Sequence, residues 1–408
     1  MSSPQPRAAL AKGLIFVGAA TMIGNGAAYL LSMVSARILT PADFGALGAL
    51  LSLLVIISTV GIATQAFAAR RVAEAGAGRA AVEGESIRMA TLAGAAVMVA
   101  ALLLAWPAGV VFDIPFIAVA TGIGSIGFVI IGSAAMGIAQ GREEHVRLSW
   151  SFIANGVGRA LGGVVGVVVL QSVTGVGIGV LVGCALGAFI AYRLSCPGAW
   201  AAAVSKGVTT ELLQVVYALM VLFTLTNVDV LLARLFLTED QSGEYSVGVL
   251  LAKIAFFLPN AIIIVLFPKM TGGRSNRTVY LATGLTAIVG LVITGFSFLF
   301  GDLVIRILGG AQYTELGSEA WLFALEGSAF ALVQVLLYAR LATRDQRAVL
   351  AVWAALGVLI AVVALWRHDS VAEIVTSVVF VSLGLTVVGL IMDRRHSPNV
   401  PIPVESAE

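Results

Sequence analysis

The sequence predicts an all-α polytopic membrane protein in which twelve transmembrane helices form two six-helix lobes, with both termini in the cytoplasm. Three observations lead to this prediction. Only 11% of the 408 residues are charged and 59% are hydrophobic, whereas a soluble domain has about 25% charged residues and a disordered chain combines low hydrophobicity with high net charge. The apolar residues form long unbroken runs, unlike the alternating segments of roughly ten residues in an outer-membrane barrel. Finally, the basic residues alternate between loops in a pattern that indicates sidedness.

Each of twelve apolar segments reaches the roughly 20 residues that a helix needs to cross the hydrocarbon core. The 45 glycines and 11 prolines agree with this interpretation, since both residue types are more frequent in transmembrane helices than in soluble ones. The predicted spans are residues 10–36, 44–68, 89–111, 116–139, 149–170, 175–194, 212–237, 245–267, 279–300, 320–341, 348–366 and 371–392.

The placement of the basic residues predicts the orientation, because cytoplasmic loops carry an excess of Lys and Arg. If the N-terminus lies inside, 18 of the 24 basic residues fall in inside segments, 3 in outside segments and 3 within spans. Both termini are therefore expected in the cytoplasm. The ratio also supports the span count, because an error of one helix would scramble the alternation downstream. The outside residues are Arg37, Arg306 and Arg367, and those within spans are Arg159, Arg234 and Lys253.

A weak internal repeat relates the two halves. Ala36-Arg37 is followed by a Thr, an Asp and a Gly before the next span, and the same residue types follow Ala233-Arg234 at an offset of 197 residues. Six spans per half, each half starting inside, predict lobes related by an axis along the membrane normal. We expect an N-terminal lobe at residues 1–194, a cytoplasmic linker at 195–210, a C-terminal lobe at 211–395 and a cytoplasmic tail at 396–408.

Arg159 is the strongest candidate for substrate binding, because charges inside a membrane are costly and are usually functional or paired. It lies near the middle of the fifth span, and the spans of the first half contain no acidic residue. An arginine in this position is expected to face water or an anionic substrate. Asn155 lies four residues earlier, shares the helix face and is a second candidate.

The other candidates lie in the second half. Asp229 and Lys253 lie at matched depth on consecutive spans, roughly 5–6 Å outward of the midpoints at 1.5 Å per residue. They form either a structural ion pair or a charge site in an aqueous cavity. In both cases the two side chains should be close together. Glu326 is either a proton or cation carboxylate or a helix-packing hydrogen-bond partner. Asn227 either holds helices together or binds substrate hydroxyls, and Arg234 lies near the outer boundary, within reach of the interface. We assign Arg159, Lys253, Asn155, Asn227 and Arg234 to substrate binding, and Asp229 and Glu326 to proton or ion coupling.

Glycines and a proline predict how some helices pack and bend. Glycines recur every four residues at 158–166 in the fifth span and at 175–187 in the sixth. This spacing lets two helix backbones approach closely, so we expect tight packing between these spans. Pro259, followed by Asn260, is a predicted hinge in the eighth span.

Several function classes are excluded or disfavoured by the sequence. The three histidines are scattered over loops, so no metal site and no catalytic cluster is expected. No phosphate-binding loop is present, no cofactor is implied, and the spread of basic residues over many loops disfavours nucleic acid as a partner. No loop exceeds about 20 residues, a length that leaves no room for the outer reactive loop that a glycan polymerase or ligase would need, and we predict that the protein is not an enzyme.

Several short strings of residues in the two halves carry a family resemblance. The first outer loop reads ARILTPADFGAL over residues 36–47. The second half contains NVDVLL at 227–232, GEY at 243–245, FPK at 267–269 and LGG at 308–310, followed by Tyr313. In the order and spacing of these strings, the sequence resembles bacterial oligosaccharide flippases, the polysaccharide biosynthesis proteins of the multidrug/oligosaccharidyl-lipid/polysaccharide superfamily. The resemblance extends over nearly the whole chain.

The resemblance implies two six-helix lobes around a central cavity that works by alternating access in the bacterial cytoplasmic (plasma) membrane. It implies translocation of polyprenyl-diphosphate-linked oligosaccharides for cell-surface polysaccharide synthesis, with membrane lipids and glycan-assembly proteins as further partners. Arg159 and Lys253 are this chain's candidates for the diphosphate. The alternative is a cation-coupled multidrug exporter of the same superfamily, with Asp229 as its cation carboxylate.

Overall fold

The computed structural model describes residues 5–195, 208–257, 276–341 and 346–395. Within this part, all regular structure is helical. The first half contains α1 (Gln5–Ile38), α2 (Pro41–Glu74), α3 (Arg79–Phe112), α4 (Phe116–Gly141), α5 (His145–Leu170) and α6 (Val173–Ser195). The second half contains α7 (Val208–Leu225), α8 (Val228–Phe236), α9 (Glu239–Phe257), α11 (Asn276–Leu299), α12 (Gly301–Leu308), α13 (Ala320–Leu341), α14 (Gln346–Trp366) and α15 (Val371–Arg395). The short 3₁₀ segments are η1 (Gly76–Gly78) and η2 (Ala311–Glu319).

The predicted fold class is confirmed. Ten of the described helices are long and apolar enough to cross a membrane, and the bent pair α7 and α8 makes an eleventh span. Helix α9 is the first part of the predicted span 245–267, whose remainder, including the predicted hinge at Pro259, lies outside the described residues. Most of the predicted linker, residues 196–207, and the predicted tail, residues 396–408, also lie outside them.

The seventh predicted span differs from the expectation of one straight helix. It is broken between Leu225 and Val228, and the two parts meet at an angle of 49°. The amide of Asn227 at the break donates to the Phe223 carbonyl over 2.9 Å, so a side chain satisfies a backbone group that the break exposes. Non-helical backbone is tolerated at membrane depth where it lines a cavity, and this break lies beside the central cavity described below.

The helices of the first half pack on one another, and the glycine spacing explains the closest of these contacts. A Cβ atom placed on Gly162 would meet the carbonyl oxygen of Gly179, and one on Gly183 would meet that of Gly158. Helices α5 and α6 therefore touch through their backbones, which confirms the predicted tight packing. Helix α1 approaches α5 in the same way, where a Cβ on Gly156 would lie 2.6 Å from Cα of Gly24.

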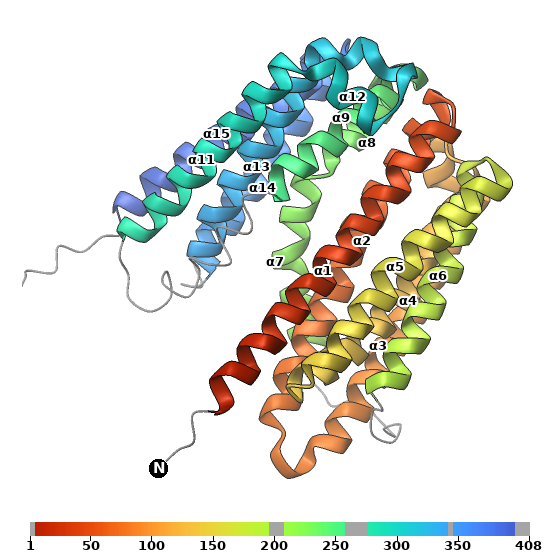
Figure 1. Cartoon of the computed structure of the whole chain (residues 1–408), viewed down its shortest axis with the longest axis vertical. Helices are drawn as coiled ribbons and strands as arrows, with labels where there is room; N and C mark the ends of the chain where they lie inside the picture. The colour runs from red at the N-terminus through yellow and green to blue at the C-terminus, as the bar shows by residue number, and fades with distance from the viewer. Residues whose placement is uncertain (1–4, 196–207, 258–275, 342–345, 396–408) are drawn as a thin grey trace, which may run out of the picture.

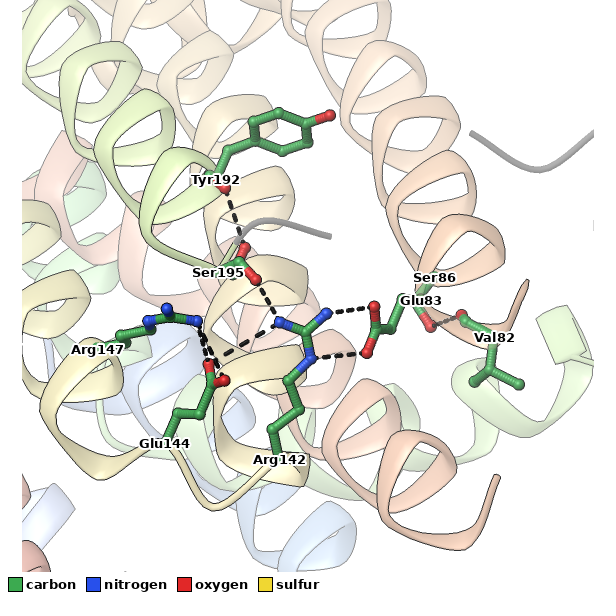
Figure 2. Close-up of polar contacts among 8 residues, drawn as sticks. All are labelled: Val82, Glu83, Ser86, Arg142, Glu144, Arg147, Tyr192 and Ser195. Atoms are coloured by element: carbon green, nitrogen blue, oxygen red, sulfur yellow. Dashed lines mark hydrogen bonds and ion pairs between the residues drawn. The ribbon is translucent and has the colours of Figure 1, made fainter. Parts of the chain in front are cut away.

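The inner ends of the first-half helices are joined by one arginine (Figure 2). The Nε atom of Arg142, in the turn between α4 and α5, donates to Oε1 of Glu83 on α3 over 2.7 Å, and Nη1 donates to the Ser195 carbonyl at the end of α6 over 2.6 Å. The neighbouring Glu144 accepts from Arg147 at 3.0 Å. One guanidinium thus ties three segments together on the predicted cytoplasmic side.

The second half packs around α13, which contacts α9, α11 and α15. Figure 1 shows this group of helices beside the α1–α6 group, with α7 running between them. Helix α7 contacts both α2 and α14, and Leu212 near its start packs with Phe67 of α2 and Met89 of α3. On the predicted outer side the two groups meet where α2 contacts α9.

Candidate functional site

A cavity of about 220 Å³ lies between the two halves of the molecule. Its walls come from α1, α2, α5 and α6 on one side and from α7, α8, α9 and α13 on the other, together with the Thr226-Asn227 break. Most of the lining residues are apolar, with a small number of polar and charged side chains among them. This composition is typical of a ligand site, in which apolar walls surround a few polar groups that fix orientation.

Arg159 lines the cavity from the first half. It stands on α5 one residue beyond the glycine stripe, so it is rotated away from the α5–α6 contact by about 100°. The described residues include no acidic side chain within 4 Å of its guanidinium. The guanidinium therefore offers its donors to the cavity.

Two carboxyl groups, those of Asp229 on α8 and Glu326 on α13, meet in the wall opposite, and both residues are buried. The two carboxyl groups lie close enough to interact with each other. Ionised carboxylates only accept hydrogen bonds, so two carboxyl groups in this arrangement can bond directly only when one of them carries a proton. Among the described residues, Asp229 Oδ1 and Glu326 Oε2 have no hydrogen-bond partner.

Lys253 on α9 lines the same cavity and interacts electrostatically with both carboxyl groups. The matched depth of Asp229 and Lys253 correctly predicts that they share one site. A direct ion pair within 4 Å does not occur between them in the described part of the chain. Instead, Asp229 accepts a hydrogen bond from the Tyr245 hydroxyl and interacts with Glu326, and Lys253 lines the cavity beside them.

The structure brings five of the seven predicted site residues to the cavity wall and places two elsewhere. Asn155 packs against α4 and α6, where a Cβ on Gly132 would lie 3.1 Å from its Nδ2. Asn155 shares the helix face of Arg159 but lies about 6 Å nearer the start of α5 at 1.5 Å per residue, where α5 meets α4 and α6. Arg234 lies at the outer end of α8, bonded to backbone of the first half. The residues at the wall are Arg159, Asn227, Asp229, Lys253 and Glu326.

Two tyrosines of the site were not predicted from the sequence. The hydroxyl of Tyr245 donates to Asp229 Oδ2 over 3.2 Å; the short connection between the antiparallel helices α8 and α9 is the signal that could have placed it beside Asp229. Tyr29 of α1 lines the cavity, and its buried hydroxyl has no hydrogen-bond partner among the described residues. No periodicity distinguishes Tyr29 from other polar residues of α1.

Solved transporter structures share this fold. An inward-facing multidrug resistance MATE family transporter of the MOP superfamily matches with a TM-score of 0.76 at 11% identity, over 90% of this chain and 93% of that one. An outward-facing transporter of the same description matches with a TM-score of 0.64 at 14% identity, over 94% and 95%. A MOP superfamily transporter from Pyrococcus furiosus, described by the reverse polarity of its binding pocket, matches with a TM-score of 0.58 at 12% identity, over 94% and 95%.

No family model and no curated protein matches the sequence. The structural likeness shows the fold, an all-helical architecture with the helices in two lobes, and the neighbours that share it are described as membrane transporters. Those neighbours are described in inward-facing and outward-facing conformations.

Proposed function

We propose that the protein translocates a polyprenyl-diphosphate-linked oligosaccharide across the bacterial cytoplasmic membrane by alternating access, for cell-surface polysaccharide synthesis. The observation that carries the proposal is the presence of two cations, Arg159 from the first half and Lys253 from the second, on opposite sides of one cavity. Cations from both lobes can hold one anionic group between them throughout the change in access.

The charge balance of the cavity favours an anion. Arg159 and Lys253 bring two positive charges, and Asp229 and Glu326 bring one negative charge when they hold one proton between them. In that state the net charge of the described wall is +1. Arginine binds phosphate oxygens through paired donors and lysine binds them as a point charge, and both are suited to a diphosphate.

The remaining polar groups suit a sugar. Tyr29 offers a buried hydroxyl and Asn227 a buried amide oxygen without partners among the described residues. Such groups pair with sugar hydroxyls, and the apolar majority of the wall excludes competing water. The lipid chain of the substrate would stay in the bilayer, so the cavity need hold only the head group.

We assign Asp229 and Glu326 to coupling with a proton or another cation. Two buried carboxyl groups in hydrogen-bond contact hold one proton in the resting arrangement and release it when they are separated. Because α8 and α13 are different helices, a movement of one against the other changes that contact. Lys253 beside them stabilises the deprotonated pair.

Flipping in proteoliposomes with a fluorescent lipid-linked sugar tests the proposal. We expect Arg159→Ala to reduce flipping by at least about tenfold, since a charge-assisted hydrogen bond contributes roughly 1.5–3 kcal/mol, and Arg159→Lys to retain part of it. Arg306→Ala, an exposed arginine of α12 outside the cavity wall, is the matched control. Unchanged flipping in Arg159→Ala would refute the role of this residue.

A cation-coupled multidrug exporter is the second candidate, favoured by the Asp229 and Glu326 carboxyl groups on the cavity wall. A cationic drug would be repelled by Arg159, so Arg159→Ala should then increase drug export instead of abolishing transport. Assaying both substrates with the same two variants separates the candidates. Association with glycan-assembly proteins and with membrane lipids belongs to the first proposal only. Co-purification of the protein with glycosyltransferases tests the association with glycan-assembly proteins.

A further inference from the structure

Arg37, in the last turn of α1, joins the first half of the molecule to the second at the predicted outer side. Its Nη1 donates to the Leu308 carbonyl over 3.3 Å, and its Nη2 donates to the Ile307 carbonyl. Both acceptors lie at the C-terminal end of α12. Beside them, the amide of Gln312 donates in the opposite direction, to the Leu39 carbonyl over 3.3 Å.

Arg234, in the last turn of α8, makes the corresponding contact from the second half to the first. Its Nε donates to the Phe112 carbonyl over 2.8 Å and its Nη2 to the Asp113 carbonyl over 2.9 Å, at the C-terminal end of α3. Its Nη1 reaches the Ala42 carbonyl at the start of α2 over 3.3 Å. Nη2 also pairs with the Asp113 carboxylate at 3.1 Å, but that side chain is 79% exposed whereas the Arg234 side chain is 4% exposed. Solvent weakens such an exposed ion pair, so the carbonyls are the principal partners.

The two arginines are equivalent in the internal repeat, in which Ala36-Arg37 matches Ala233-Arg234 at an offset of 197 residues. Their acceptors are equivalent as well. The end of α3 follows the third span of the first half, and α12 follows α11, the third span of the second half. The two contacts therefore lie at corresponding places in the two halves, and each arginine bonds the opposite half.

Helices α2 and α9 cross between these two contacts and show the same reciprocity. A Cβ on Gly45 of α2 would meet the hydroxyl of Ser242, and a Cβ on Gly243 of α9 would meet the carbonyl of Pro41. The two backbones touch through glycines, so the outer side is closed by direct contact as well as by hydrogen bonds.

We propose that Arg37 and Arg234 form a two-point latch that holds the outer side closed, and that both must release their carbonyls before the cavity opens outward. Helix C-terminal carbonyls carry partial negative charge, and the guanidinium is always protonated, so each contact is a charge-assisted hydrogen bond. Because neither the guanidinium nor the backbone carbonyls titrate, the carbonyl contacts of the latch hold at any physiological pH and are released by substrate or by movement elsewhere.

Distances between spin labels at Leu170→Cys and Asp369→Cys, exposed outer positions in the two halves, measure the opening in a background with Cys184 and Cys196 replaced. We expect Arg37→Gln to raise the ratio of open to closed molecules roughly tenfold, and Arg37→Gln with Arg234→Gln to raise it further. Since Arg37 is exposed, its variant should fold even if the Arg234 variant does not.

Two controls isolate the latch. Arg306→Gln removes an exposed outer arginine of α12 and should leave the distances unchanged. Asp113→Asn removes the exposed carboxylate but keeps both carbonyl acceptors. Asparagine tolerates the left-handed backbone at this position (φ 48°), so this variant should also leave the distances nearly unchanged. Distances in Arg37→Gln and in the double variant that equal those of Arg306→Gln would overturn the proposal. The measurement uses no substrate, so its outcome is independent of what the protein transports.

Discussion

The hydroxyl of Tyr245 donates to Oδ2 of Asp229 over 3.2 Å, and the other oxygen of Asp229 has no hydrogen-bond partner among the described residues. Tyr245 is fully buried and its ring packs edge-on against Phe323 of α13. The tyrosine therefore fixes the rotamer of Asp229 and, through Phe323, links α9 to the helix that carries Glu326. This makes Tyr245 a positioning residue for the carboxyl pair.

Tyr245→Phe should change the pH profile of transport more than its maximal rate. The variant keeps the ring and its packing on Phe323, but removes one donor from Asp229, which destabilises the ionised form of that carboxyl group by about 1 kcal/mol. We expect the profile to move to higher pH by roughly half to one unit. An unchanged profile with lower maximal transport would instead indicate a packing role.

Glu326→Gln and Asp229→Asn should uncouple transport from the proton gradient. An amide can still donate to the remaining carboxylate, so Glu326→Gln keeps the hydrogen bond but cannot exchange the proton. Flipping or uptake driven by an imposed pH difference should fall to the level seen without one. The control is Ser328→Ala, on the same helix as Glu326, which changes no charge and should preserve the response to the pH difference. Gln334→Glu would not serve as a control because it adds a charge.

Gly162→Val should destabilise the packing of α5 on α6. Its side chain would run into the Gly179 carbonyl, and overpacking of this kind costs about 1–3 kcal/mol. The apparent Tm in detergent measures the loss. Gly124→Ala on α4 has nothing within 4 Å of the added Cβ and should leave the Tm unchanged or slightly higher, because alanine is the better helix former; equal losses in both variants would contradict this account.

Arg142→Met should destabilise the inner end of the first half by about 3 kcal/mol. It removes the two-donor contact to Glu83 and the bond to the Ser195 carbonyl (Figure 2), and breaking a buried ion pair costs roughly 3–5 kcal/mol. Arg147→Met is the matched control, because Arg147 is 48% exposed and contacts only Glu144 among the residues described here. Adding Glu83→Gln to Arg142→Met should recover part of the Tm.

Glu315→Gln should make the protein less sensitive to mild acid on its outer side. Burial raises the pKa of Glu244, and the like charges of Glu315, Glu319 and Asp240 raise it further. A folded-state pKa above the unfolded value means that stability increases as pH falls through the folded pKa. In Glu315→Gln the repulsion is weaker, so the gain in apparent Tm between about pH 7 and pH 4 should be smaller than in the unaltered protein.

Hydrophobicity and charge along the chain were enough to predict the fold class, most span positions and the depth of the charged residues within the spans. Long apolar runs and the alternation of basic loops depend on local hydrophobicity and on charge sidedness, and both can be read without tertiary contacts. The four-residue spacing of the glycines predicted the contact between α5 and α6. The matched depth of Asp229 and Lys253 predicted that they lie near each other, because consecutive antiparallel helices lie side by side.

The contacts between polar residues, in contrast, could be identified only in the folded protein. No proline marks the break at Thr226-Asn227 in the sequence, and the cavity that lies beside the break is visible only in the structure. The contact between Asp229 and Glu326 joins helices 97 residues apart in sequence, a separation over which periodicity carries no information. Arg234 was predicted as a substrate residue from its depth alone, whereas its partners are carbonyls of the opposite half. A hydrogen bond to backbone leaves no side-chain signature in the partner's sequence, and for that reason the latch is visible only in three dimensions.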